Sequence, residues 1–253
     1  GELYTQKSGA RPEKVKVELV RDDEQQLATL KFSQGATSAS VSPDGKQIAF
    51  IVRGDVFVTS TDYATTKQIT NTPAKEAAIS FAPDNRTLVY ASERTGNWQL
   101  YTAKISRKED PNFPNATLIE EEVLLPSKTV ERTYPQYSPD GKYIAWQSME
   151  RDGYEADLNR LFIMNLETGE KRFVSKTFES NVDAFVWGAD AKVIYFTGVW
   201  HGESQIYALD LANDSVKAIT SGMYDYEGVA LFGDKLIAKR HSMSMGDEIY
   251  SVA

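Results

Sequence analysis

The sequence predicts an all-β fold, a β-propeller of five blades, each a four-stranded antiparallel sheet. One observation is a repeated hairpin, in which a short apolar strand leads into a turn centred on aspartate and a second apolar strand follows. The five copies are centred on Asp44, Asp84, Asp140, Asp190 and Asp234. The other observation is their spacing of 40, 56, 50 and 44 residues, which is the period of four-stranded units in propeller arrays.

Each position of the repeated turn has a physical reason. The copies around Asp44 and Asp140 read Ser-Pro-Asp-Gly. Proline presets φ at the first corner, the aspartate side chain accepts hydrogen bonds from nearby backbone N–H groups, and the following Gly or Asn tolerates a positive φ. The aspartates therefore recur because the turn requires them, and we assign them to architecture rather than to catalysis.

The strands are predicted from the spacing of apolar residues around each turn. Ile48, Phe50 and Val52 alternate with a period of two, as in a β-strand. A third strand is expected after each hairpin, at residues 56–58, 99–101, 161–163, 205–207 and 248–250. More polar fourth strands follow at residues 67–70, 171–174 and 217–220, a composition that suits an exposed sheet edge. The third strands should place aromatic rings at equivalent buried positions, namely Tyr101, Phe162, Tyr207 and Tyr250.

Both ends of the chain carry strands without a hairpin. Residues 2–4 and 15–19 resemble a third and a fourth strand, and residues 248–252 form a third strand with no fourth strand after it. We therefore expect the ring to close through the termini, with residues 15–19 completing the last blade. The alternative is that the chain is a segment of a longer propeller.

Composition indicates one compact domain over residues 1–253. The chain has 253 residues, of which 41% are hydrophobic and 11% aromatic, enough to bury a substantial core. With 36 acidic and 28 basic residues the net charge is −8, which disfavours binding to nucleic acid because phosphate contacts need a basic face. No segment approaches the roughly 20 apolar residues of a membrane-spanning helix, so membrane insertion is not expected.

The chain contains no cysteine, which excludes disulfides and thiolate metal sites. The absence fits an oxidising compartment, and we expect a periplasmic or otherwise exported location. A cytoplasmic domain that happens to lack cysteine is the alternative.

Longer phrases of the sequence resemble two families of peptidase propellers. From Gly1 to about Glu131, the phrases GELYTQKSG and DNRTLVYASERTGNWQLYTAKI resemble the propeller of tricorn-type proteases. From about Tyr134 onward, YPQYSPDGKYIAWQSMERDGYEADLNRLFIMNLETGEKR and KRHSMSMGDEIYSV resemble the propeller of prolyl-oligopeptidase-type serine peptidases. The SPDG turns are shared by many propellers, TolB among them, and indicate the fold only. The change of resemblance near residues 134–142 has two interpretations, uneven divergence of a natural relative or a chimera joined at the shared turn.

The resemblance implies a propeller that is not catalytic by itself. The resembled enzymes carry their nucleophile on a separate domain, and the Gly-x-Ser-x-Gly elbow of an α/β-hydrolase does not occur here. His201 and His241 are the two histidines, and adjacency of His241 to Ser242 does not make a catalytic pair. Residues 120–122, three consecutive glutamates, would point to alternate faces of a strand and cannot converge on one ion. We therefore assign no catalytic residue, no cofactor and no metal ligand.

The function that the resemblance implies is access control for a peptidase. Such a propeller would guide or filter peptides toward an active site on another domain, so the expected partners are peptides or a peptidase catalytic domain. One alternative is a stand-alone TolB-like interaction scaffold in the periplasm. Another is an engineered or recombined propeller without a biological function.

One insertion, residues 149–160, is the candidate for partner contact. It is longer than the equivalent connection at residues 53–54 and carries alternating charges around a tyrosine, the composition of a recognition loop. The candidate contact residues are Arg151, Tyr154, Glu155, Asp157 and Arg160. The alternative is a surface turn whose ion pairs only stabilise its blade.

Overall fold

The computed structural model describes residues 3–16, 31–149, 151, 154 and 156–252. The chain forms two compact units, residues 1–33 and residues 34–253, and each is described by itself. In the first unit, β1 (Tyr4–Thr5) pairs with β2 (Glu13–Lys14) in an antiparallel hairpin. The prediction of one domain over residues 1–253 stays a prediction.

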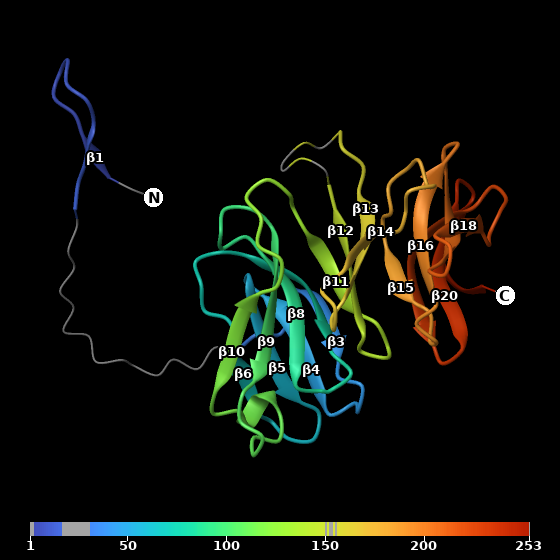
Figure 1. Cartoon of the computed structure of the whole chain (residues 1–253), viewed down its shortest axis with the longest axis horizontal. Coiled ribbons are helices and arrows are strands. Elements are labelled where there is room, and N and C mark those ends of the chain that lie inside the picture. The colour runs from blue at the N-terminus through green and yellow to red at the C-terminus, as the bar shows by residue number, and fades with distance from the viewer. Residues whose placement is uncertain (1–2, 17–30, 150, 152–153, 155, 253) are drawn as a thin grey trace. The chain divides into compact units, whose positions relative to one another are not determined.

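The second unit consists of five antiparallel sheets that follow one another in chain order (Figure 1). The first blade holds β3 (Ala36–Val41), β4 (Gln47–Val52), β5 (Asp55–Ser60) and β6 (Thr66–Gln68). The second holds β7 (Glu76–Phe81), β8 (Thr87–Ser92), β9 (Gln99–Ile105) and β10 (Ile119–Val123), with the short 3-10 helix η1 (Phe113–Asn115) between the last two strands. The third holds β11 (Thr133–Tyr137), β12 (Tyr143–Ser148), β13 (Arg160–Asn165) and β14 (Lys171–Phe173). The fourth holds β15 (Phe185–Trp187), β16 (Val193–Trp200), β17 (Glu203–Asp210) and β18 (Ser215–Ala218), and the fifth holds β19 (Asp225–Phe232), β20 (Lys235–Ser242) and β21 (Met245–Val252).

The predicted all-β propeller of five blades is thereby confirmed. Four of the five sheets have four strands, and among the described residues the fifth has three. Residues 15–19 were expected to complete the fifth blade. Val15 instead donates its backbone N–H to the carbonyl of Leu3 within the first unit, 2.8 Å away. Residues 17–19 lie outside the described residues. Closure through the termini therefore stays a prediction. Among the described residues, no helix has the length and apolar character needed to cross a membrane.

The aspartate turns have the expected geometry. Asp44 Oδ1 accepts hydrogen bonds from Ser42 Oγ at 2.6 Å and from the Lys46 backbone N–H at 3.1 Å. The bond from Ser42 is the main reason that the pKa of Asp44 lies below its usual range. The next residue has a positive φ in four of the five turns: Gly45 (71°), Asn85 (58°), Gly141 (70°) and Ala191 (58°). Local sequence therefore determines these turns.

The aromatic residues of the third strands occupy the expected equivalent positions, but their burial differs. In the first four blades an aromatic of the second strand is paired with one of the third: Phe50 with Phe57, Tyr90 with Tyr101, Trp146 with Phe162 and Phe196 with Tyr207. In the fifth blade the partner of Tyr250 is Ala238. Tyr101 and Tyr207 are buried, whereas Phe162 is half-buried and Tyr250 is 38% exposed. The prediction that Phe162 and Tyr250 are buried was thus wrong, because Phe162 borders a cavity and Tyr250 lies on the last strand of its sheet.

A hydroxyl cap recurs where the chain leaves the fourth strand. In three blades, a hydroxyl oxygen accepts the backbone N–H of a third-strand residue 14 positions earlier: Thr70 from Val56 (2.9 Å), Ser175 from Leu161 (2.9 Å) and Thr220 from Ile206 (2.8 Å). In the second blade Leu125 occupies the corresponding position. The correspondence follows from the preceding residue, Leu124, whose backbone N–H donates to the Leu100 carbonyl. The cap satisfies a buried donor that lies beyond the end of the sheet ladder.

Each junction between consecutive blades contains a buried glutamine, and we call this set the junction glutamines. Gln47 Nε2 donates to the Asn85 carbonyl (3.0 Å), Gln99 to Val130 (2.8 Å), Gln147 to Val182 and Asp183 (both 2.7 Å), and Gln205 to Gly222 and Tyr224 (3.1 and 2.9 Å). In every case the acceptor belongs to the next blade or to the connection that leads into it. All four side chains are at most 6% exposed. These bonds fix neighbouring sheets relative to one another in a medium where an unpaired amide is costly.

Candidate partner-contact site

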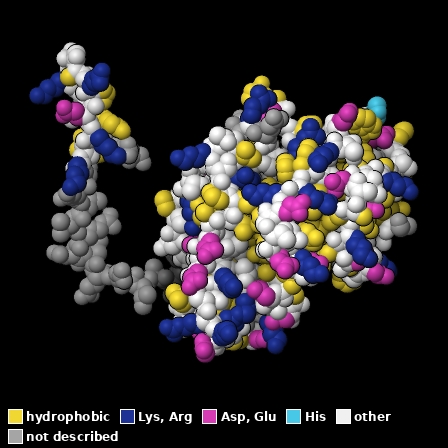
Figure 2. Space-filling model, in the orientation of Figure 1, with side chains coloured by type: hydrophobic (Ala, Val, Ile, Leu, Met, Phe, Trp, Pro, Cys, Tyr) yellow, Lys and Arg dark blue, Asp and Glu magenta, His cyan; other side chains and the backbone are white. Residues whose placement is uncertain are grey.

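The candidate loop lies on one end of the propeller unit, which we call the upper face. It is defined by the connections between the second and third strands of the blades, at residues 53–54, 93–98, 149–159, 201–202 and 243–244. The aspartate turns lie at the opposite ends of the same strands. Figure 2 shows acidic and basic side chains interspersed over the visible face of residues 34–253, so that side lacks the continuous basic surface that a nucleic acid requires.

The structure brings three of the five predicted contact residues into one cluster. Arg151 donates to the carboxylate of Asp157 from its backbone N–H (2.8 Å), Nε (3.0 Å) and Nη2 (2.5 Å). The guanidinium carbon of Arg151 lies 3.7 Å from the ring centroid of Tyr154, a residue that is 48% exposed. The hydrogen bond from Arg151 is the main cause that lowers the pKa of Asp157. Arg160 lies apart at the start of β13, and Glu155 lies outside the described residues.

A cavity of about 900 Å³ opens beside this loop, and its lining comes from the third blade and from the connection that leads into that blade. One wall is a ladder of aromatic rings across three strands of the third blade. Trp146 stacks on Phe162 with centroids 5.8 Å apart, and Phe162 stacks on Phe173 at 5.0 Å. The indole of Trp146 is buried, and its Nε1 has no hydrogen-bond partner among the described residues. Such a concave site with aromatic walls is typical of ligand binding.

The cavity also has a surplus of basic side chains. Arg132, Arg160 and Lys171 line it, and Asp157, already paired with Arg151, is the acidic residue in the same lining. Arg132 Nη1 donates to Gln99 Oε1 (2.7 Å) and to the Leu125 carbonyl (2.8 Å).

Arg160 is bound in a comparable way. Its Nη1 donates to the Phe178 carbonyl (3.0 Å), and its guanidinium carbon lies 5.7 Å from the centroid of the Phe173 ring. Both arginines are half-buried, and within the described part of the chain neither has a carboxylate partner. Burial lowers the pKa of Arg132, the direction expected when a cation is moved out of water without an anion.

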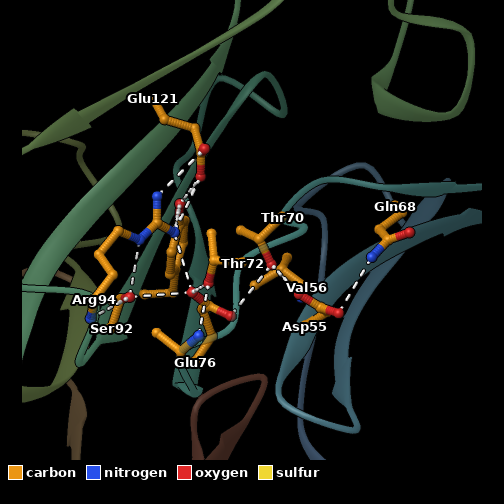
Figure 3. Close-up of polar contacts among 11 residues, drawn as sticks. Asp55, Val56, Gln68, Thr70, Thr72, Glu76, Ser92, Arg94 and Glu121 are labelled. Atoms are coloured by element: carbon orange, nitrogen blue, oxygen red, sulfur yellow. Dashed lines mark hydrogen bonds and ion pairs between the residues drawn. The ribbon is translucent and has the colours of Figure 1, made fainter. Parts of the chain in front are cut away.

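A second group of charged residues on the upper face forms a closed network at the junction of the first and second blades (Figure 3). Glu76, the first residue of β7, is fully buried and pairs with Arg94 at 3.1 Å. Its carboxylate also accepts hydrogen bonds from Ser92 (3.0 Å) and Thr72 (3.2 Å). Burial raises the pKa of Glu76 and outweighs these bonds.

The same network extends to the outer strand of the second blade. Arg94 reaches Glu121 at 3.3 Å, and the Tyr90 hydroxyl donates to that carboxylate. The guanidinium carbon of Arg94 lies 4.3 Å from the centroid of the Tyr101 ring. Glu121 is exposed on β10, yet its carboxylate contacts Arg94 of the β8–β9 connection and Tyr90 of β8. The groups satisfy one another, so the network is structural support rather than an open site.

Among the described residues, neither histidine has a serine hydroxyl as its hydrogen-bond partner. The ring of His201 packs edge-on against Trp200 with centroids 4.9 Å apart. His241 Nδ1 lies 3.6 Å from Asp247, while the Ser242 hydroxyl faces Ser244 at 3.5 Å. The described residues contain no group of three or more His, Asp or Glu side chains that could hold a metal ion.

Sequence reasoning missed Arg132 and Trp146. Arg132 lies in the connection that precedes β11, and Trp146 lies in a strand where its apolar character is already explained by core packing. Their shared role depends on two adjacent blades, which no local pattern records. The sequence offered one weak signal for Arg132. This cation comes immediately before a predicted inner strand, and Glu131 is its acidic neighbour in sequence.

Fold and site together define a five-bladed β-propeller with a ligand-sized cavity on its upper face. In sequence, the chain is similar to Dipeptidyl-peptidase 5 of Porphyromonas gingivalis, with 39% identity over 175 residues, which cover 69% of this chain and 25% of that protein. It is also similar to a TolB homolog of Chlorobaculum tepidum, with 26% identity over 135 residues, or 53% of this chain and 27% of that protein. The chain therefore spans about a quarter of the length of the curated relatives it matches. No family model matches the chain.

Solved structures show the same fold at low sequence identity. The putative TolB of Agrobacterium tumefaciens has a TM-score of 0.65 and 16% identity, covering 85% of this chain and 79% of that one. Puromycin hydrolase has a TM-score of 0.64 and 14% identity, covering 96% of this chain and 38% of that one. The propeller domain of the trilobed protease of Pyrococcus furiosus has a TM-score of 0.52 and 15% identity, covering 87% of this chain and 80% of that one. The predicted resemblance to peptidase propellers and to TolB is thus confirmed.

Proposed function

We propose that this chain is the accessory propeller of a peptidase, not catalytic by itself, which guides or filters peptides toward an active site on another domain. The observation that carries the proposal is the 39% identity to Dipeptidyl-peptidase 5 over 69% of this chain and only 25% of that protein. A match of this extent is what a non-catalytic propeller shared by larger enzymes would give. The prolyl endopeptidase and puromycin hydrolase structures, of which the chain covers 34% and 38%, support the same assignment.

Two features of the upper face support such a role. Tyr154 offers an exposed aromatic ring, and its position over the Arg151 guanidinium holds the ring in place. The aromatic wall of the cavity beside it would take an apolar side chain of a peptide. Arg151, Tyr154, Glu155, Asp157 and Arg160 remain the candidate contact residues in this proposal, and the partners are peptides or a peptidase catalytic domain.

The first test concerns catalysis by the isolated chain. An active-site serine probe and a set of short peptides are applied to the purified protein. Neither labelling nor cleavage is expected, because among the described residues no serine hydroxyl is hydrogen-bonded to a histidine. The reading frame on both sides of this segment is determined in the same work. An adjoining hydrolase domain supports the proposal, whereas labelling of the isolated chain contradicts it.

The second test concerns peptide contact. Peptides carrying a photo-crosslinker are bound to the wild-type chain, to Tyr154→Ala and to Tyr63→Ala. Tyr63 is a matched control, since it is 41% exposed but lies in the connection between β5 and β6 at the opposite end of the strands. We expect Tyr154→Ala to reduce cross-linking severalfold and Tyr63→Ala to leave it unchanged. Equal yields from all three proteins would remove the loop from the proposal.

A stand-alone TolB-like scaffold is the second candidate function. The observation in its favour is coverage, because the chain spans 79% of the putative TolB structure but only 38% of puromycin hydrolase. In this case the protein would bind other proteins through a propeller face in the periplasm. Co-purification of a protein partner from the periplasmic fraction, together with a reading frame that holds no hydrolase, would favour it.

A further inference from the structure

Arg132 and Arg160 bring to the cavity on the upper face positive charge that no carboxylate of the described residues neutralises. The hydrogen bonds of Arg132 and Arg160 go to an amide oxygen and to backbone carbonyls, all of them neutral acceptors. Among the other half-buried arginines, Arg94 is paired with Glu76 and Glu121, whereas Arg86 donates only to backbone carbonyls. Arg132 and Arg160 differ from Arg86 because both line one cavity. Two such cations in the lining of one cavity point to an anion that enters it from outside.

The physical argument rests on what it costs to bury a cation. A guanidinium out of water without a counter-charge is unfavourable, and a carboxylate that approaches it gains a charge-assisted bond in a medium of low dielectric. In both arginines the hydrogen bonds come from Nη1, and among the described residues Nε and Nη2 have no acceptor. A planar carboxylate matches that arrangement of donors.

The rest of the cavity lining indicates which chemical groups the ligand carries beside the anion. The ladder of Trp146, Phe162 and Phe173 forms an apolar wall, and the buried Trp146 Nε1 is a donor without an acceptor in the described chain. Asp157, the acid in the lining, is held by Arg151 and leaves the surplus charge of Arg132, Arg160 and Lys171 in place. The cavity volume of about 900 Å³ is large enough for two or three amino-acid residues.

We propose that this cavity binds the carboxylate of a peptide through Arg132 and Arg160, with a neighbouring apolar side chain packed on the aromatic ladder. The inference rests on the proposed function, since it names the chemistry of the peptides that the upper face would select. A free C-terminus and a glutamate side chain both present this group, and the test separates the two sources.

The test uses the full chain and three probe peptides. They are N-acetyl-Ala-Phe with a free C-terminus, the same peptide as its amide, and N-acetyl-Glu-Phe amide. Binding is measured by calorimetry, and the indole N–H resonance of Trp146, assigned with Trp146→Phe, reports contact with the cavity. We expect the amide without glutamate to bind at least about tenfold more weakly than a peptide whose carboxylate fits. A preference for the free acid identifies a C-terminus as the ligand, and a preference for the Glu peptide identifies a side chain.

Variants connect the binding to the two arginines. Arg160→Gln and Arg132→Gln should each weaken the preferred peptide at least about tenfold, and Arg160→Lys should recover part of the loss because it restores the charge. Arg172→Gln is the matched control, since it removes the same charge from an arginine that pairs with Asp214 outside this cavity. Circular dichroism and melting temperature establish that each variant is folded, and Arg160→Gln carries the test if Arg132→Gln does not fold.

Three outcomes would overturn the inference: equal binding of acid and amide peptides, no binding of any peptide at millimolar concentration, or full binding by Arg160→Gln. They are distinguishable from failure of the proposed function. If acid and amide peptides bind equally but Tyr154→Ala weakens both, the upper face still contacts peptides and only the carboxylate site is wrong. If the acid peptide binds and shifts Trp146 while the reading frame holds no hydrolase, the site stands and the peptidase assignment fails.

Discussion

Gly198, within β16, is a residue whose side chain must be absent. A Cβ atom at this position would lie 2.6 Å from Phe178 Cζ and 2.7 Å from the Asn181 carbonyl oxygen. Phe178 cannot easily move, because it is buried and packs on Phe196 and Tyr207 with centroids 5.0 and 4.7 Å apart. The glycine therefore allows the connection between the third and fourth blades to lie directly on the strand.

We predict that Gly198→Ala lowers the free energy of unfolding by about 1 to 3 kcal/mol, the usual effect of overfilling a packed core. Gly246→Ala is the control, since Gly246 also lies in a strand but has nothing within 4 Å of the Cβ position. It should change stability by less than about 0.5 kcal/mol. Chemical denaturation of both variants checks the prediction, and equal stabilities would show that Phe178 gives way.

Glu76 makes stability depend on pH through its burial. Its pKa in the folded protein is raised above 4.5 because burial disfavours the charged form. The folded state therefore binds the proton more tightly than the unfolded state does, and the resulting stabilisation is full below pH 4.5 and is lost as pH rises through the raised pKa.

We predict that the unfolding free energy of wild type relative to Glu76→Gln falls as pH rises from about 4 to about 7. Denaturant melts at several pH values measure the difference. Glu122→Gln, at an exposed position of β10, makes the same change in net charge and serves as the control. A difference that stays constant or grows with pH would mean that Arg94 dominates over burial.

At the scale of single residues, the sequence predicts the role of a residue when its partners lie within a few positions along the chain. Asp44 and Asp140 act within five residues of chain, so the SPDG pattern contains everything that their hydrogen bonds need. Glu76 and Arg132 act on partners that approach only when two blades pack together. The sequence thus predicted the turns and the candidate loop, but neither the buried network nor the charged cavity.

At the scale of elements, the strands follow from period-two alternation, and the joints between sheets depend on the junction glutamines. Gln147 is 1% exposed and lies in β12, where its amide donates to two carbonyls of the connection that leads into the fourth blade. The apolar alternation of β12 gives no reason to expect a polar side chain in that place. Its role becomes visible only from the neighbouring blade.

We predict that Gln147→Met, a change of similar volume, costs about 1 to 3 kcal/mol, because the buried Val182 carbonyl and the partly buried Asp183 carbonyl lose their donor. Gln68→Met, at an exposed position of β6, should be nearly neutral. Thermal and denaturant unfolding of the two variants measure the contrast. If both variants unfold like wild type, the joint is held by apolar packing and the glutamine is dispensable.

At the scale of the whole molecule, the edge of the last blade bears on closure of the ring. Among the described residues the outer edge of β21 pairs with no fourth strand, and Ile249 on that strand is 84% exposed. An unpaired edge of this kind invites association with other chains. The fold class was predictable because five local hairpins repeat, whereas closure requires a contact between the two ends, on which the repeats carry no information.

We predict that deletion of residues 1–20 lowers stability by several kcal/mol and promotes association, on the order expected for the loss of a packed strand pair. Hydrogen exchange of the β21 amides in the full chain and in the truncated chain is the measurement. Amides on the outer edge should lose protection on truncation. Unchanged protection, with a monomeric truncated protein, would show that the N-terminal residues do not complete the last blade.

The junction glutamines also bear on how such a molecule can change its number of blades over evolutionary time. For the second, third and fourth blades, a stretch of gene that encodes the blade, its glutamine and the connection that follows also encodes both partners of the joint, the amide and the carbonyls. Duplication or recombination of that stretch would insert a sheet whose interface already fits its neighbours, because each sheet contacts mainly those beside it. Genes with such repeats can gain, lose or exchange blades without inventing new interfaces, and a join near residues 134–142 between two ancestral propellers would have needed no further adjustment.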